Sequence, residues 1–92
     1  MLAPYKAYQA SDGYVIIAAG NDNLFRNLCK GLGLPKMAQD ERFATNALRV
    51  ANRVQLNRNI EEAVGQATMA EWVETLNALG VPCAPIQSVH DV

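Results

Sequence analysis

The sequence predicts an α+β domain, in which a small, mainly antiparallel sheet of two to three strands packs against three to four helices. Three observations lead to this prediction. Two β-rich stretches near the start of the chain are separated by a turn signal. Apolar residues then recur with a period of about 3.6 through much of the middle of the chain. A stretch interrupted by prolines, which excludes a helix and suits a strand, comes last.

The bulk composition suits one small domain spanning residues 1–92. Half of the 92 residues are hydrophobic, which allows a compact core. The formal net charge of −1 provides no general attraction for nucleic acid or for an anionic membrane. We find neither a signal segment nor an apolar run close to the roughly 18 residues that cross a bilayer. We therefore expect a cytoplasmic protein with no nucleic-acid or membrane partner.

The charges are distributed unevenly along the chain. Residues 26–58 hold seven basic and two acidic side chains, whereas the residues after Arg58 are acidic or neutral. Two solvated helix faces explain this distribution, and so does a basic patch that meets an acidic partner or a phosphate-bearing ligand.

The first two elements are predicted as strands of a hairpin. Residues 5–10 alternate large and polar side chains, and Ser11-Asp12-Gly13 is a strong turn signal. The second strand, residues 14–19, is β-branched at its centre and apolar on both faces. We therefore expect it to be a central strand covered on both sides.

An amphipathic helix follows Gly20, where the period changes from two to about 3.6. Asp22 or Asn23 can cap its start, and Gly31 or Gly33 can end it in a left-handed turn. Its apolar face consists of Leu24, Phe25, Leu28, Cys29 and Leu32.

Residues 20–23, Gly-Asn-Asp-Asn, form what we call the polar corner. The structural interpretation is a strand-to-helix turn whose side chains cap the helix. The functional interpretation is a helix start that offers backbone N–H groups to an anion, although the charge of Asp22 opposes that use. The corner has too few glycines for a phosphate loop and lacks the dinucleotide glycine spacing.

The middle of the chain is predicted as a connector followed by a helix. In the connector, residues 34–45, Pro35 can start a short turn of helix. Thr45 or Asn46 can cap the next segment, and residues 47–52 can form a separate turn joined at an angle. The helix then ends near Gly65, and its apolar face consists of Leu56, Ile60, Ala63 and Val64.

The last helix begins at a capping box, in which Thr68 and Glu71 bond each other's backbone. Residues 81–86 must be extended because of their two prolines, and they suit an edge strand. Ser88 is predicted to cap a further helix. A stripe of apolar residues at helical spacing is interpreted as core rather than as a ligand pocket, and it consists of Met69, Trp72, Val73, Leu76 and Leu79.

No complete catalytic constellation is found in the sequence. Cys29 and Cys83 are far apart, without ligands nearby for a metal, and we expect both to be buried free thiols. His90, the only histidine, lies near the end of the given sequence, and we therefore expect no catalytic triad. The acidic pairs at residues 40–41 and 61–62 are interpreted as solvated charges, since sequence neighbours point in different directions on a helix. No metal site is predicted.

Several segments together resemble the family III CoA-transferases, also called the CaiB/BaiF family, which includes formyl-CoA and carnitine-CoA transferases and α-methylacyl-CoA racemases. Their order and spacing over nearly the whole chain make the resemblance specific. These segments are Pro4-Tyr5, residues 12–18, Gly20-Asn21-Asp22, Leu28-Cys29, residues 32–35, residues 40–46, residues 49–53, Trp72 and residues 80–86.

The resemblance implies that this chain corresponds to the small domain of those enzymes, which closes the acyl side of the cleft. It also implies an α/β large domain with the CoA site and the aspartate that forms acyl-anhydride and CoA-thioester intermediates, in two interlocked subunits. No residue of this chain corresponds to that aspartate, so Asp12, Asp22, Asp40 and Asp91 are not candidates for it. The nucleotide-binding fold and the glycine-rich active-site loop are absent as well.

We therefore expect a detached or truncated small domain of an acyl-CoA transferase, without activity of its own. Asn21 and Asp22 are the candidate substrate-binding residues. Arg42, Arg49 and Arg53 are candidates for binding the phosphates of CoA. No cofactor is required, because CoA and acyl-CoA are substrates in the parent family. The expected partner is a CoA-transferase large domain or a second copy. The alternative is a stand-alone binding or assembly module that keeps the fold and self-associates or binds another protein.

Overall fold

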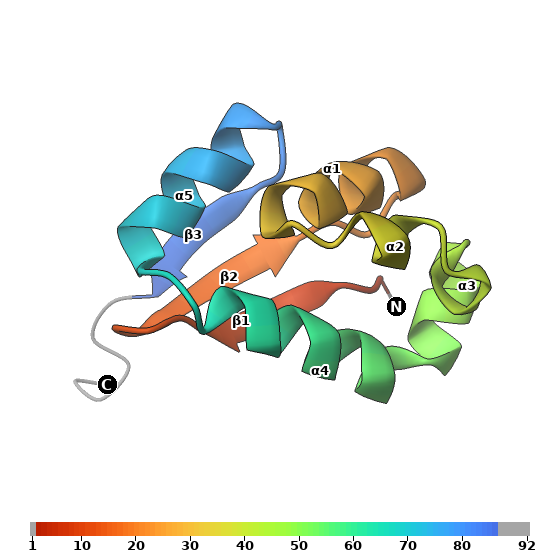
Figure 1. Ribbon diagram of the computed structural model, residues 1–92. Coiled ribbons are helices and arrows are strands. Elements are labelled where there is room, and N and C mark those ends of the chain that lie inside the picture. Colours follow the sequence, from red (N-terminus) through yellow and green to blue (C-terminus); the bar gives the residue numbers. More distant parts are fainter. Residues whose placement is uncertain (1, 87–92) are drawn as a thin grey trace.

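The computed structural model describes residues 2–86 and has the predicted α+β architecture (Figure 1). The described part holds five α-helices rather than three or four, because the two short turns predicted around Pro35 and residue 47 are helices of their own. In chain order the elements are β1 (Tyr5–Gln9), β2 (Tyr14–Ala18), α1 (Asp22–Leu32), α2 (Pro35–Ala38), the 3-10 turn η1 (Glu41–Phe43), α3 (Asn46–Ala51), α4 (Arg53–Val64), α5 (Met69–Ala78) and β3 (Cys83–Ile86).

The sheet is antiparallel in the order β1-β2-β3, so the second strand is central and the last lies at an edge, as predicted. The prediction that the central strand is covered on both faces is wrong. Val15 and Ile17 are fully buried, whereas Tyr14 is 42% and Ile16 37% exposed. The described helices lie on one side of the sheet (Figure 1). A strand that is apolar on both faces does not by itself reveal whether a second layer is present.

The core lies between the sheet and the helices. Helix α4 packs against β1, and α5 packs against β2 and β3. The predicted apolar faces supply most of the buried side chains, among them Leu28 of α1, Ile60 of α4 and Leu76 of α5. Trp72 is buried and its indole N–H donates to the Val64 carbonyl at 2.7 Å. The interpretation of that apolar stripe as core is thus confirmed.

Helix ends follow the predicted chemistry with one correction. The cap of α1 is Asn21, not Asp22 or Asn23, because its side-chain oxygen accepts from the backbone N–H of Leu24 three residues later. Gly33 ends α1 with a left-handed φ of 73°. The capping box of Thr68 and Glu71 is present at the start of α5. Thr45 caps α3, and the helix predicted after Ser88 lies outside the described residues.

Candidate functional site

The polar corner joins the end of β2 to the start of α1. The Asn21 side chain accepts from the Leu24 N–H at 2.8 Å, which satisfies a helix donor that has no partner within the helix. The Asp22 carboxylate accepts from Nη2 of Arg49 at 2.9 Å, and its side chain stays 54% exposed. The corner therefore presents an amide and a carboxylate to solvent from a backbone that is fixed by hydrogen bonds.

Arg49 on α3 is completely buried and holds the corner in place. Its Nε donates to the Ala3 carbonyl at 2.8 Å, its Nη1 to the Phe43 carbonyl at 3.0 Å and its Nη2 to the Gly20 carbonyl at 3.1 Å. With the Asp22 contact, the guanidinium joins α3 to three other segments, namely the residues before β1, the polar corner and η1. A buried charge is tolerated in such a site because its donors are paired.

An aromatic ring adds to this enclosure. The Arg49 guanidinium carbon lies 4.7 Å from the centroid of the Phe25 ring, within the range of a cation–π interaction. Phe25 in turn meets Phe43 edge to face at a centroid distance of 6.4 Å. The predicted contact between Arg49 and a phosphate in solvent is not compatible with this position, since the guanidinium has no exposed surface.

Gly20 is needed where the first residues of the described chain pass the corner. A Cβ placed on Gly20 would lie 2.7 Å from the Cβ of Leu2, closer than real Cβ atoms approach a neighbour. The backbone N–H of Ala3 donates to the Asn46 side chain at 3.0 Å, and the Ala3 carbonyl binds Arg49. The corner, the segment before β1 and the start of α3 thus form one packed unit.

Arg42 and Arg53 are exposed, unlike Arg49. Arg42 binds Asp40 through Nη2 at 2.7 Å and Nε at 3.1 Å, and these contacts keep the pKa of the Asp40 carboxyl below its usual value. Arg53 donates to the Val50 carbonyl at 3.1 Å. The amide of Asn52 donates to the Arg42 carbonyl at 3.1 Å, which places the backbone of Arg42 beside the residue before Arg53.

The three described aspartates all accept hydrogen bonds within the fold. Asp12 accepts from the backbone N–H of Met69 at 2.9 Å, which ties the β1–β2 turn to the start of α5. Asp22 is paired with Arg49 and Asp40 with Arg42. Each of these carboxylates therefore stabilises a local contact of the fold; Asp91 lies outside the described residues.

The cysteines are buried free thiols, as predicted. Burial raises the pKa of Cys29 to about 12, against the opposing charge of Arg49, and burial raises the pKa of Cys83 to about 11. Both thiols therefore stay protonated at neutral pH and are poor nucleophiles. Within residues 2–86, no three Cys, His, Asp or Glu side chains gather to hold a metal ion. The same residues contain no helix long and apolar enough to cross a membrane.

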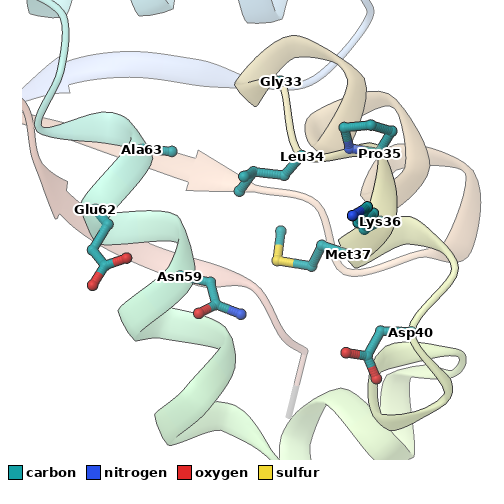
Figure 2. Close-up of a pocket in the computed structure, with 9 residues that line it drawn as sticks. All are labelled: Gly33, Leu34, Pro35, Lys36, Met37, Asp40, Asn59, Glu62 and Ala63. Atoms are coloured by element: carbon teal, nitrogen blue, oxygen red, sulfur yellow. The ribbon is translucent and has the colours of Figure 1, made fainter.

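A groove lies between the α1–α2 connection and α4, and sequence reasoning did not predict it. Its volume is about 630 Å³. Figure 2 shows Leu34 and Met37 reaching toward α4, with Asn59 facing them from that helix. The rim carries charges of both signs, from Lys36, Asp40 and Glu62. This mixture selects no ligand class, and the groove is separate from the polar corner.

The central role of Arg49 was also missed, and little in the sequence reveals it. Three of its acceptors are backbone carbonyls, which every residue type has, so the sequence does not distinguish them. The only side-chain signal is the opposite charge of Asp22, 27 residues away. Asn77 was missed for a similar reason: its amide donates to the Cys83 carbonyl at 3.0 Å and its oxygen accepts from the Cys83 N–H at 3.3 Å.

Comparison with known proteins gives a consistent result. Residues 1–92 match the model of CoA-transferase family III. The chain is 37% identical to succinyl-CoA:glutarate CoA-transferase of Mus musculus, over 99% of this chain and 21% of the mouse protein. It is 38% identical to acetyl-CoA:oxalate CoA-transferase of Acetobacter aceti, over 98% of this chain and 23% of that protein.

A solved structure shares the fold. The crystal structure of a CaiB/BaiF family protein from Brucella suis superposes with a TM-score of 0.92 at 47% sequence identity. The match covers 99% of this chain and 24% of the Brucella suis chain. The chain thus spans about a fifth to a quarter of the length of the relatives that it matches.

Proposed function

The chain belongs to CoA-transferase family III, and from this membership we propose that it serves as the small domain of an acyl-CoA transferase. In the complete enzyme, CoA passes from an acyl-CoA to a carboxylic acid. One observation carries the proposal. The family model matches residues 1–92, yet this chain spans only 21–24% of the length of the relatives named above.

The described carboxylates support a role that is not catalytic in isolation. Asp12, Asp22 and Asp40 are each engaged by a backbone N–H or an arginine of the fold. The family resemblance implies that the nucleophilic carboxylate belongs to the remainder of the enzyme. CoA and acyl-CoA take part as substrates, and the proposal requires no further cofactor.

We place the polar corner at the acyl side of the cleft. Asn21 and Asp22 present polar atoms to solvent, and the buried Arg49 fixes the backbone that carries them. Of the three arginines predicted to bind CoA phosphates, only Arg42 and Arg53 are exposed. These two remain our candidates, and a phosphate would compete with Asp40 for Arg42.

A transferase assay with a chimera tests this function. The chimera carries this chain in place of the matching segment of the mouse enzyme, and glutaryl-CoA formation from succinyl-CoA and glutarate is measured. We expect turnover by the chimera and none by the isolated chain or by the mouse enzyme without that segment. Turnover by the isolated chain would refute the non-catalytic role, and a folded chimera without activity would refute the small-domain role.

One observation favours a second candidate, a stand-alone assembly module. Tyr5, Tyr14 and Ile16 are 58%, 42% and 37% exposed, and neighbouring apolar side chains of this kind favour association. Such a module would self-associate or bind another protein. Sedimentation of the isolated chain tests self-association: a mass that stays monomeric up to roughly millimolar concentration argues against it, since a contact of 1 mM affinity is worth only about 4 kcal/mol.

A further inference from the structure

One face of the sheet is open in the part of the chain that the structure describes. The helices lie on the other side (Figure 1). Because side chains alternate along a strand and paired residues share a face, the register assigns one set of side chains to this side. We call it the open sheet face, and it consists of Tyr5, Ala7, Gln9, Tyr14, Ile16, Ala18, Ala84 and Ile86.

The open sheet face has the composition of a protein interface rather than of a solvated surface. Lys6 is the only charged residue of the three strands, and its ammonium lies on the helix side, 3.2 Å from Glu61 of α4. The large exposed hydrophobic side chains of the open sheet face are two tyrosines and an isoleucine, and Gln9 is its only amide side chain. Interface centres are depleted in charge and enriched in aromatic residues in the same way.

A hollow near one end of this face makes part of it concave as well as apolar. Its volume is about 360 Å³, and it reaches from the open face to the edge of the sheet, where Pro82, Cys83 and Asn77 of α5 complete a lining that includes Tyr5, Ile16 and Ala18. A concave, mostly apolar site of this kind can receive an anchoring side chain of a partner.

We propose that the open sheet face packs against the remainder of the CoA-transferase polypeptide. This inference rests on the proposed function. In the Brucella suis protein the same fold, at a TM-score of 0.92, occupies 24% of the chain, so most of that polypeptide lies outside the matched segment. A covalently attached domain is present at a high effective concentration, and it therefore occupies an apolar face ahead of a second copy in solution.

Thiol labelling of single-cysteine additions tests the contact. Ile16→Cys places a thiol on the open sheet face, and Val54→Cys places the control thiol on α4, where Val54 is 71% exposed. Both are made in the isolated chain and in the chimera with the mouse enzyme. The native Cys29 and Cys83 give little background, because they are buried. Mass spectrometry of the labelled peptides reports each position separately.

We expect the Ile16→Cys thiol to react at least about tenfold more slowly in the chimera than in the isolated chain, because a covered thiol reacts only on local opening. The Val54→Cys thiol should react equally in both. Equal labelling at position 16 in both proteins would overturn the proposal. Slow labelling of the Ile16→Cys thiol in the isolated chain would also overturn the proposal. If that protection increases with protein concentration, a second copy covers the face. If it does not depend on concentration, the terminal residues of the same chain cover it.

The readouts separate this proposal from the proposed function. If the chimera forms glutaryl-CoA but its thiol at position 16 labels as fast as in the isolated chain, the proposed function is supported and the proposed contact is refuted. If the thiol is protected but the chimera is inactive, the contact is supported and the function is refuted. Should the chimera not fold, the same two substitutions at the equivalent positions of the Brucella suis protein give the labelling result.

Discussion

Two arginine–aspartate pairs in this chain have similar geometry and opposite surroundings. Nη2 of Arg49 lies 2.9 Å from Asp22, and Nη2 of Arg42 lies 2.7 Å from Asp40. The Arg49 side chain has no exposed surface, whereas that of Arg42 is 53% exposed. The buried arginine also binds three carbonyls, while the exposed one closes a local turn. Both guanidinium groups lie over a phenylalanine ring, so the ring contact does not distinguish them. We infer that the first pair determines the fold around the polar corner and the second contributes little.

The largest expected effect is that of Arg49→Met. The substitution keeps an apolar stem but removes the donors of the Ala3, Gly20 and Phe43 carbonyls, all in buried residues. A buried acceptor without a partner costs about 1–3 kcal/mol, so we expect the free energy of unfolding to fall by at least about 3 kcal/mol. Urea denaturation followed by circular dichroism measures the change.

The matched control is Arg53→Met, on the exposed start of α4, where Arg53 makes one hydrogen bond to the Val50 carbonyl. We expect a change within about 0.5 kcal/mol, as for most surface substitutions. Arg49→Lys should fall between the two, because an ammonium keeps the charge but lacks the fork that reaches several acceptors. Equal stability of the two methionine variants would contradict the role given to Arg49.

The same comparison explains how far the sequence predicts this structure. Thr68 and Glu71 are three residues apart, and this spacing was sufficient to predict their capping box. The Asp40–Arg42 pair is equally local, but it was not predicted, because Asp40 was interpreted as a solvated charge. The Arg49–Ala3 bond spans 46 residues and ends on a carbonyl that any residue type would supply. The open sheet face was missed for a related reason, because the apolar pattern of β2 does not reveal whether a second layer covers it.

The family resemblance carried most of the functional prediction, while the residue pattern carried the secondary structure. Asn21 and Asp22 remain candidates for the acyl side of the cleft, since both are exposed. Arg49 was predicted to bind phosphate on the same grounds as Arg42 and Arg53, namely its charge. Burial, which separates it from the other two, depends on how the residues before β1, the polar corner and η1 meet α3, and no one of these segments encodes it.

An intermediate effect is expected from Gly20→Ala, which tests how tightly the corner is packed. The new Cβ would lie 2.7 Å from the Cβ of Leu2, so the first described residues must move away from Arg49. Overpacking of this kind costs about 1–3 kcal/mol, and thermal and urea unfolding measure it. The second-site change Leu2→Gly removes the clashing atom and should restore part of the loss. Failure of that rescue would show that the crowding lies elsewhere.

The smallest expected effect is that of Asp40→Asn, which removes the charge and keeps an oxygen to cap η1. Hydrogen bonds from Arg42 lower the pKa of Asp40 in the folded chain, so the folded state favours the ionised form. The resulting stability is present above the pKa of the unfolded chain and disappears as the pH falls through the lower folded value. The wild-type chain should therefore slightly exceed the variant in stability at pH 7, and the difference should close in acid. Salt should reduce it as well, because the pair is exposed. Urea unfolding of both proteins across pH measures this difference in the free energy of unfolding. A difference that grows as the pH falls would contradict the stabilising role given to the ionised Asp40.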